Sequence, residues 1–512
     1  MACLPCSHIA PFASTMSTAE SSLQPTPTAL AGARAADDLG MVSWEDSIRK
    51  GSLTPFFQTE PNPDATRWML LVFFDFPPSA EVGALRWLSL SRFGAERGWA
   101  IDVVSLHPAF MGPIDPTRLE QLPRGIRLFG ASGDYPAWYR TILSAWRKVR
   151  RPGGVPVAGG PARVDRANGT EPYRPAGPTW RRVFLSRAHF ALTDVLARRA
   201  SAIGAELTAA NQYDVVASSG PPHAAHEAAK TIATRARLPW VLDMRDPWSD
   251  ESAMPDELGG TVWRRETRAR ERACVSAATL VVVTSQAHEE LQLAKYPDVR
   301  GRIVTVMNGA DSDPLPTGSP GTRFVIAFTG QIYLGRNPRP LFQAAARVAR
   351  ATGASPNEFA VEFMGAEACE GVPLTTIARE EGLGAHFRSH GFRPRREALE
   401  LLASATLLVN LQARTKTSLA AKLFEYTRFD AWLLALADSD SATARLLVDT
   451  DADVVPPDDV DAIEGAIANR FAQFRAGVRP TALNRDGRFD RATQSARLFD
   501  ALEMLSATAR QR

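Results

Sequence analysis

Short runs of apolar residues, each followed by a loop and an amphipathic stretch, recur from residue 68 onward and restrict the possible folds more than any other feature. The first run is Trp68–Phe74, and the stretch from Leu85 to Arg97 then carries apolar residues near helical spacing. A run that is apolar on both faces is typical of a strand buried on both sides, and strands that alternate with helices form parallel sheets. The sequence therefore predicts an α/β protein.

The alternation falls into two series. Strands are predicted at residues 68–74, 100–105, 213–217, 239–242, 279–284 and 303–307, and then at residues 324–328, 359–364, 406–411 and 432–437. Residues 311–321 between the series are rich in Pro, Gly and Asp, which is typical of a linker. We expect two Rossmann-like domains that face each other across a cleft, with ligands at the carboxyl ends of their strands.

The 512 residues are expected to form four segments. Residues 1–45 are rich in Ala, Ser, Thr and Pro and predict a disordered leader, or a start codon placed too early. Residues 46–315 are the expected N-terminal domain and residues 316–475 the expected C-terminal domain. Residues 476–512 are expected to be a helical tail that packs back on the N-terminal domain.

Charge and cysteine content exclude several classes of function. A net charge of +3 over 512 residues is too small to indicate a nucleic-acid partner. The only closely spaced cysteines are Cys3 and Cys6, in the expected leader, so neither a disulfide framework nor a metal site is predicted. No uncharged apolar run approaches the roughly 20 residues that span a bilayer. These features favour a cytoplasmic protein.

Candidate phosphate-binding residues follow two strands of the second series. Residues 417–426 read Thr-Ser-Leu-Ala-Ala-Lys-Leu-Phe-Glu-Tyr, and we expect a helix to begin near Ser418, with its free amides and dipole directed at a diphosphate. Lys422 and Glu425 lie three residues apart on that helix, where they could meet phosphate oxygens and ribose hydroxyls. An ordinary surface ion pair is the alternative.

The second candidate loop joins strand 324–328 to the following helix. Gly330 and Gly335 allow close backbone approach to a ligand, and Arg336 is placed to contact phosphate. A plain turn with an exposed arginine is the alternative.

The first series carries its own polar strand ends. His223 ends the segment Ser-Ser-Gly-Pro-Pro-His after strand 213–217 and is expected to face the cleft, unless it is a structural histidine. Asp243, Arg245 and Asp246 follow strand 239–242. Buried charges are tolerated only when paired, so Arg245 and Asp246 either pair with each other or bind a polar ligand.

Taken in order, six segments resemble a known family: SSGPPHAAH, PWVLDMRDPWS, VVVTSQAHEELQ, VMNGAD, FTGQIY and AAKLFEYTRFDAWLLALAD. Together they resemble GT-B-fold glycosyltransferases of the retaining family-4 type, and the resemblance runs from about residue 68 to about residue 475. It implies that the C-terminal domain binds a nucleotide-sugar and the N-terminal domain an acceptor. It implies no metal and no cofactor beyond the nucleotide-sugar substrate.

Residue roles carry over from the resemblance position by position. Glu425 matches the second glutamate of the E-x7-E motif, which holds ribose, whereas Thr417 stands in place of the first, which contacts the donor sugar. The usual lysine after the glycine loop is missing, and Arg336 and Arg339 are its nearest substitutes. These departures leave the donor's identity open. The implied donor-binding set is Gly83, Gly330, Gln331, Arg336, Thr417, Ser418, Leu419, Lys422 and Glu425.

The resemblance implies hexose transfer with retention of anomeric configuration, with His223, Arg245 and Asp246 lining the acceptor side as the catalytic set. It also implies a glycan, lipid-linked or small-molecule acceptor. Two alternatives stay open: a nucleotide- or carbohydrate-binding protein of the same fold that has lost catalysis, and a nucleotide-sugar epimerase. A dehydrogenase is disfavoured because no G-x-G-x-x-G follows the first strand.

A basic insertion is expected at residues 140–187, which hold eleven Arg or Lys residues, two acidic residues and two of the three tryptophans Trp138, Trp146 and Trp180. Such a segment could bind the inner, anionic face of a membrane or a lipid-diphosphate acceptor. A solvated loop is the alternative.

Overall fold

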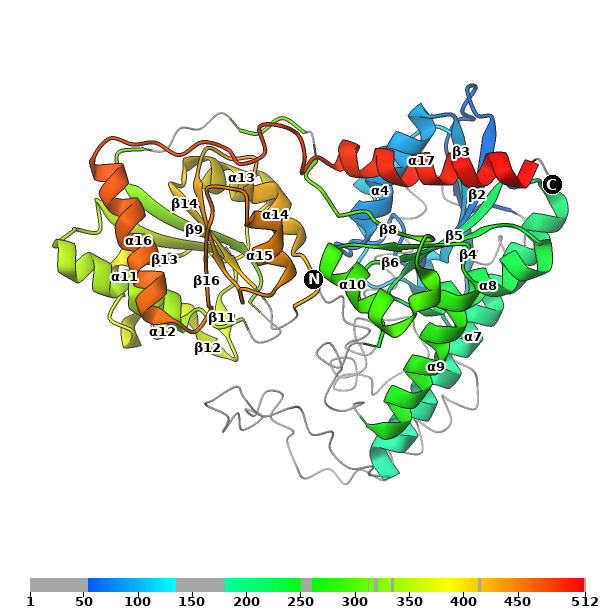
Figure 1. Ribbon diagram of the computed structural model, residues 1–512, viewed down its shortest axis with the longest axis horizontal. Helices are drawn as coiled ribbons and strands as arrows, with labels where there is room; N and C mark the ends of the chain where they lie inside the picture. Colours follow the sequence, from blue (N-terminus) through cyan, green and yellow to red (C-terminus); the bar gives the residue numbers. More distant parts are fainter. Residues whose placement is uncertain are drawn as a thin grey trace, which may run out of the picture.

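The computed structural model describes residues 54–134, 180–249, 260–311, 313–316, 321–332, 336–412 and 416–510. They form two α/β domains that lie side by side (Figure 1). Each domain has one large sheet with helices on both faces. The predicted leader, residues 1–45, and residues 140–179 of the predicted basic insertion lie outside the described residues.

The N-terminal sheet has the order β1-β4-β3-β2-β5-β6-β7-β8. β1 pairs antiparallel with β4, and all other neighbours in this sheet are parallel. The strands are β1 (Phe57–Gln58), β2 (Arg67–Val72), β3 (Trp99–Leu106), β4 (Ile126–Ala131), β5 (Val215–Gly220), β6 (Trp240–Met244), β7 (Leu280–Val283) and β8 (Ile303–Thr305).

Both faces of this sheet are covered, which explains the unbroken apolar runs in its central strands. Met69 and Leu71 of β2 face one apolar core, and Leu70 and Val72 face the other, because successive side chains of a strand alternate. The helices of this domain are α4 (Ala84–Glu96), α5 (Thr117–Glu120), α7 (Trp180–Ala210), α8 (Ala224–Ala236), α9 (Thr261–Ala277) and α10 (Gln286–Lys295).

The C-terminal sheet is parallel throughout, in the order β13-β10-β9-β14-β15-β16. Its strands are β9 (Phe324–Gly330), β10 (Phe359–Gly365), β13 (Phe387–Ser389), β14 (Leu407–Leu411), β15 (Trp432–Leu436) and β16 (Asp453–Val455), and β11 (Ala368–Cys369) and β12 (Val372–Pro373) form a separate hairpin. Its helices are α11 (Arg339–Thr352), α12 (Leu374–Glu380), α13 (Arg395–Ser404), α14 (Ala421–Tyr426), α15 (Ala442–Leu447) and α16 (Val460–Arg475).

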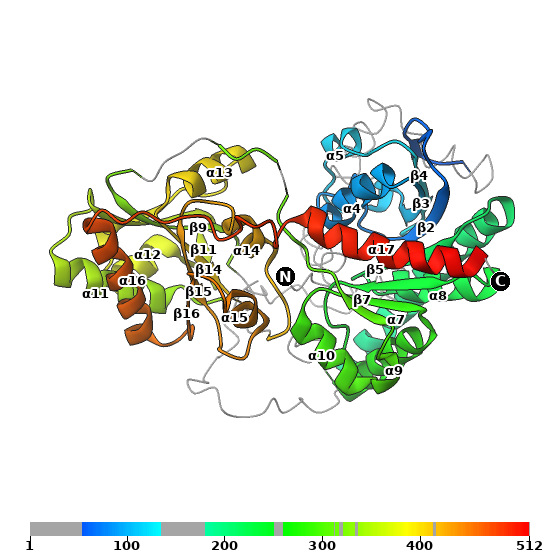
Figure 2. The same ribbon diagram turned by 45° about the horizontal axis from the view of Figure 1, so that its top comes forward.

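After α16 the chain returns to the N-terminal domain as α17 (Arg491–Arg510), which lies along that domain in both ribbon views (Figures 1 and 2). The ring of Phe499 packs where Gly94 of α4 leaves room: a Cβ at Gly94 would lie 2.6 Å from the ring. Arg97 pairs with Asp500 and Glu503, both at 2.7 Å. Arg491, at the start of α17, pairs with Asp311 at 3.0 Å.

The structure differs from the expected elements in the middle of the N-terminal domain. β4 lies in a section that the apolar pattern had left irregular, since its charged Arg127 breaks the run. Arg127 is tolerated because it pairs with buried Asp102, which also accepts a hydrogen bond from Tyr213. α7 begins at Trp180, so the last eight residues of the expected insertion, residues 180–187, are helical.

Candidate functional site

The side chain of Lys422, a residue of α14, reaches the carboxyl end of β9, one of the two central strands of the C-terminal sheet. Its Nζ donates a 2.7 Å hydrogen bond to the carbonyl oxygen of Thr329 and lies 4.3 Å from the centre of the Phe328 ring. A Cβ at Gly330 would lie 2.3 Å from that Nζ, and Gly330 has φ = +113°, a conformation that favours glycine. Glycine therefore makes room for the ammonium group at the strand end.

Burial lowers the pKa of Lys422 from its usual 10.5 to about 7, with a further lowering by Arg336 and an opposing effect of Glu425. The interior site is unfavourable to a cation. At neutral pH, Lys422 is therefore divided between its ammonium and amine forms, and an anion nearby would favour the ammonium.

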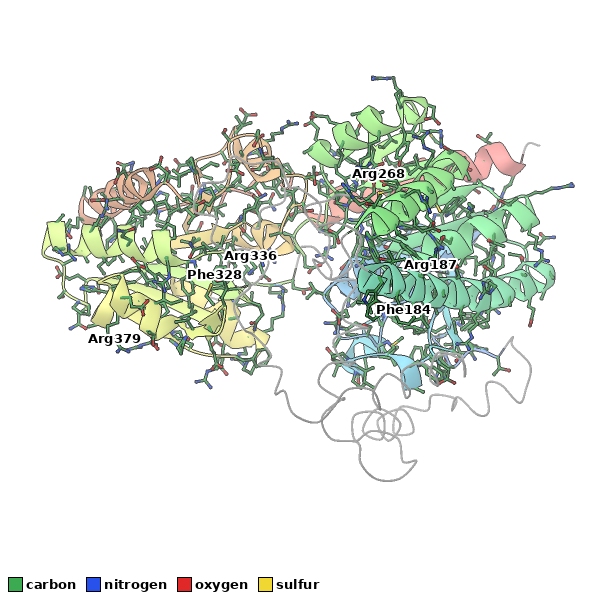
Figure 3. The ribbon with its side chains drawn as sticks, turned by 90° about the horizontal axis from the view of Figure 1, so that it is seen from below. Phe184, Arg187, Arg268, Phe328, Arg336 and Arg379 are labelled. Atoms are coloured by element: carbon green, nitrogen blue, oxygen red, sulfur yellow. The ribbon has the colours of Figure 1, made fainter. Side chains whose placement is uncertain are left out.

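Two more predicted donor residues reach the same edge of the sheet. Arg336 is buried, and its Nε donates to the carbonyl oxygen of Leu411, the last residue of β14, at 2.9 Å. Gln331 Nε2 donates to the carbonyl oxygen of Gly365, the last residue of β10, also at 2.9 Å. The carboxyl ends of three neighbouring strands thus hold these side chains with Lys422 (Figure 3 labels Phe328 and Arg336).

The helix that carries Lys422 starts later than expected. We expected it to begin near Ser418, but α14 begins at Ala421 and ends at Tyr426. Ser418 and Leu419 are buried in the loop before it. The expected helix start at Ser418 is therefore wrong, because the backbone is still extended at Ala420, the N-cap of α14.

Glu425 forms an ion pair in this structure. Its Oε1 lies 2.6 Å from Nη2 of Arg395, the first residue of α13, and Glu425 is the more shielded partner. A residue 30 positions earlier could not be assigned to this pair from sequence, since the ordinary partner of a helical glutamate lies three or four residues away.

On the N-terminal side, Arg245 and Gly83 come together from loops after β6 and β2. A Cβ at Gly83 would lie 1.9 Å from Nη1 of Arg245, so a larger residue at this position would displace the guanidinium from its present place. Arg245 Nη2 donates to the carbonyl oxygen of Pro221 and lies 3.8 Å from Oδ2 of Asp75. The guanidinium carbon lies 4.8 Å from the centre of the Phe73 ring.

His223 precedes α8 on the same side of the sheet. Its ring stacks on Trp248 at 4.5 Å, and its Nδ1 is buried with no hydrogen-bond partner. Burial lowers the pKa of His223 well below its ordinary value, and His226 and Arg245 lower it further. The imidazole is therefore neutral at pH 7. Asp246, the third predicted acceptor-side residue, follows Arg245 and is partly exposed.

Asp243, two residues before Arg245, has a structural role. It is fully buried and accepts hydrogen bonds from Nε and Nη2 of Arg86 at 3.1 and 2.9 Å, and from Trp87 Nε1 and Ser219 Oγ at 2.9 Å. These bonds join α4 to the ends of β5 and β6, so Asp243 anchors the loop that carries Arg245.

Two residues that the sequence analysis did not single out connect the two sides. Thr284 Oγ1 donates to the carbonyl oxygen of Arg245 at 2.7 Å, and the adjacent Ser285 Oγ donates to the carbonyl oxygen of Thr417 at 2.5 Å. Ser285 also caps α10 by accepting from the amide of His288. A serine between a strand and a helix signals such a cap, but nothing in the sequence indicates its contact with Thr417.

A second contact lies nearby, where Glu290 of α10 pairs with Arg445 of α15; Figure 2 shows these helices facing each other between the domains. Arg245 and Thr417 are thus linked by hydrogen bonds from two adjacent residues, Thr284 and Ser285. These two residues contact the backbone carbonyls of one predicted acceptor-side residue, Arg245, and one predicted donor-binding residue, Thr417.

Within the described ranges, no group of three or more His, Cys, Asp or Glu side chains is placed to hold a metal ion. The helices in that part of the chain are also too short or too polar to cross a membrane.

No protein-family model matches the chain. A curated relative, D-inositol 3-phosphate glycosyltransferase 1 of Catenulispora acidiphila, is 26% identical over 230 residues, which are 40% of this chain and 51% of the relative. The chain thus spans about half the length of this relative.

Solved structures match over most of the chain. Sucrose-phosphate synthase from Thermosynechococcus elongatus matches 86% of this chain and 100% of its own, with a TM-score of 0.51 and 14% identity. The lipopolysaccharide outer core galactosyltransferase WaaB matches 85% of this chain and 99% of its own, with a TM-score of 0.52 and 11% identity. TarM matches 86% of this chain and 99% of its own, with a TM-score of 0.51 and 9% identity. The predicted GT-B fold is confirmed.

Proposed function

We propose that this GT-B protein is a glycosyltransferase that moves a sugar from a nucleotide-sugar to an acceptor with retention of anomeric configuration. The observation that carries the proposal is the placement of Lys422 and Arg336 within electrostatic reach of each other at one buried edge of the C-terminal sheet. Burial and the nearby Arg336 disfavour the charged form of Lys422, so an anion bound beside it would stabilise that charge. A diphosphate is such an anion.

Each donor residue then has a chemical role. Lys422 and Arg336 would neutralise the diphosphate as it leaves, assisted by Gln331 and by backbone amides at Gly330, Ser418 and Leu419. Glu425 would accept hydrogen bonds from ribose hydroxyls once Arg395 moves aside. Thr417 would lie beside the donor sugar.

The acceptor would bind on the N-terminal side. A neutral His223 can accept a hydrogen bond from an acceptor hydroxyl, and Arg245, with Gly83 beneath it, offers a fixed cation near the donor phosphate. Asp246 would be the third polar residue that lines the acceptor site, after His223 and Arg245. The hydroxyl would attack the face from which the nucleotide departs, so this scheme needs no covalent carboxylate nucleophile, unlike retaining glycosidases.

The proposed activity is tested with a panel of nucleotide-sugars, incubated with the full chain in the presence and absence of sugar and lipid-linked acceptors. We expect nucleoside diphosphate release that depends on acceptor, and activity that persists in EDTA because side chains rather than a metal would neutralise the diphosphate. Donor binding without turnover across the panel would favour a binding protein, for which Thr417 in place of the family glutamate is the supporting observation. An epimerised donor without acceptor would favour an epimerase.

The pKa of Lys422 predicts a pH dependence of nucleotide binding. A bound diphosphate raises that pKa above its free value of about 7, so binding near pH 7.5 should take up a proton. Below pH 7 the ammonium is already present, and the group contributes its full effect. As pH rises above 7, we expect affinity to fall by up to about tenfold per pH unit until the pKa of the complex is reached.

Isothermal titration calorimetry with a nucleoside diphosphate in two buffers of different ionisation enthalpy measures this proton uptake. The matched control is Lys422→Arg, which stays charged throughout the range and should bind without taking up a proton at this site. Equal apparent enthalpies for the natural chain in both buffers would contradict the assignment of the phosphate to Lys422.

A further inference from the structure

The first turns of α7 and α9 project beyond the sheet of the N-terminal domain (Figure 1). Trp180 is 78% exposed and Phe184 is 42% exposed, although both are large apolar side chains. Because residues four and seven apart share a face of a helix, Trp180, Phe184 and the exposed Arg187 form one stripe. The projecting end therefore presents aromatic rings to solvent beside an arginine.

The charge of this projecting end is strongly positive. Residues 180–194 of α7 and residues 261–270 of α9 contain seven arginines, one aspartate (Asp194) and one glutamate. That glutamate, Glu266, already accepts from Arg270 at 3.0 Å. Figure 3, seen from the side toward which the helices project, places Phe184 and Arg187 on α7 and Arg268 on α9.

The projecting helices are held firmly to the domain. Trp263 of α9 packs against the rings of His189 and Phe190 of α7 at 4.6 and 4.9 Å. Arg270 bridges Asp194 at 2.6 Å and Glu227 of α8 at 2.9 Å, and its guanidinium lies 4.8 Å from the centre of the Phe190 ring. These contacts join α7 to α8 and α9 from His189 onward, one to three turns after Phe184 and Trp180.

We propose that the projecting end of α7 and α9 docks on the surface of an anionic lipid bilayer. Trp180 and Phe184 would enter the headgroup layer, where amphipathic and aromatic side chains are favoured, and the arginines would face lipid phosphates. The positive charge of the arginines is complementary to anionic headgroups. The exposed rings of Trp180 and Phe184 would add affinity for the bilayer beyond that of the charges. The first turns of α7 and α9, and not a transmembrane helix, make the contact.

The location of this face also bears on the acceptor, and this step rests on the proposed transferase function. The projecting end contacts α8 through Arg270, which pairs with Glu227 at 2.9 Å, and Glu227 lies one helical turn after His223, the residue at the N-cap of α8. The docking face thus adjoins the side of the N-terminal domain assigned to the acceptor. An acceptor anchored in the same bilayer would reach His223 without leaving the membrane surface, which favours the lipid-linked class of acceptor.

Vesicle flotation of the full chain, with no nucleotide-sugar present, tests the docking face. We expect binding to phosphatidylglycerol-containing vesicles and little binding to pure phosphatidylcholine, with a steep decrease at high salt. The double variant Trp180→Ser/Phe184→Ser should bind about tenfold more weakly. The double variant Arg187→Glu/Arg265→Glu should lose at least as much affinity for the vesicles, since each lipid-facing arginine contributes about fivefold to that affinity.

Single-residue controls in the other domain remove the same kinds of side chain. Phe392→Ser removes a ring that is 81% exposed, and Arg379→Glu reverses an exposed arginine of α12; both should bind like the natural chain. Binding by the natural chain that is undiminished in both double variants overturns the proposal, as does absence of binding to anionic vesicles. Because the assay contains no donor, its result is independent of whether sugar transfer is observed.

Discussion

Replacement of Lys422 by alanine is expected to abolish the thermal shift that a nucleoside diphosphate gives the natural protein. The ammonium group is positioned by the Thr329 carbonyl and by the space at Gly330, so no neighbouring lysine can replace it. Loss of a charge-assisted contact in a buried site costs about 3 kcal/mol, which weakens binding about 100-fold. At ligand concentrations near the original Kd, a ligand bound so weakly no longer raises the melting temperature.

The matched control is Lys416→Ala, six residues earlier in the chain. Lys416 is exposed and pairs with Asp440 at 2.7 Å, outside the strand ends that hold Lys422. It should keep the full thermal shift. A full shift in Lys422→Ala would instead refute the placement of the phosphate, and Lys422→Met, which keeps most of the apolar stem over Phe328, separates loss of charge from loss of packing.

Replacement of Asp243 by alanine is expected to have the largest effect on stability, a loss of about 3 to 5 kcal/mol in the free energy of unfolding. Burial alone would raise the pKa of Asp243, but the charge and hydrogen bonds of Arg86, with those of Ser219 and Trp87, hold it below its usual value. Without the carboxylate, the buried guanidinium of Arg86 loses its counter-charge, and that uncompensated charge dominates the cost. Denaturant unfolding monitored by circular dichroism measures the change.

Asp500→Ala is the control for this experiment. Asp500 also pairs with an arginine, Arg97, at 2.7 Å, but it is 61% exposed. Exposed pairs contribute about 1 kcal/mol or less, so the control should change stability little. The double variant Arg86→Met/Asp243→Ala should regain part of the loss, because no buried charge is left unpaired. Similar losses for Asp243→Ala and Asp500→Ala would contradict the role assigned to Asp243.

The lowered pKa of Asp243 also fixes the direction of its pH effect. A group whose pKa is lower in the folded than in the unfolded state stabilises the fold above its unfolded pKa, and this stability is lost as pH falls through the folded value. The difference in stability between the natural chain and Asp243→Ala should therefore shrink under acid.

Strand positions could be predicted from sequence because both sheets are buried on both faces. The apolar runs at residues 324–328 and 359–364, for example, lie within β9 and β10. β4 was not predicted, because its charged residue Arg127 interrupts the apolar run. The charge is tolerated because Arg127 pairs with Asp102 on the neighbouring strand β3. Such compensation is visible only when the strands are side by side.

The candidate site divides in the same way. Gly330, Gln331, Arg336 and Lys422 could be named because each follows a predicted strand, and parallel strands bring their carboxyl ends to one edge. The residues that contact the predicted site could not be named from sequence. Arg395 lies beside Glu425, Arg245 beside Gly83, and Ser285 against Thr417, and the members of these pairs are 30, 162 and 132 positions apart in the chain.

The amino-acid sequence by itself determined the two α/β domains and the strand ends at which polar residues gather, because hydrophobic periodicity and turn chemistry act over a few neighbouring residues. Only the tertiary structure decided which charges meet. In the folded chain, burial near Arg336 lowers the pKa of Lys422, and Asp243 forms an ion pair with Arg86. The side chains of Trp180 and Phe184 are exposed to solvent at the start of α7. Desolvation and ion pairing depend on distances between segments remote in the chain, and those distances exist only once the domains have folded.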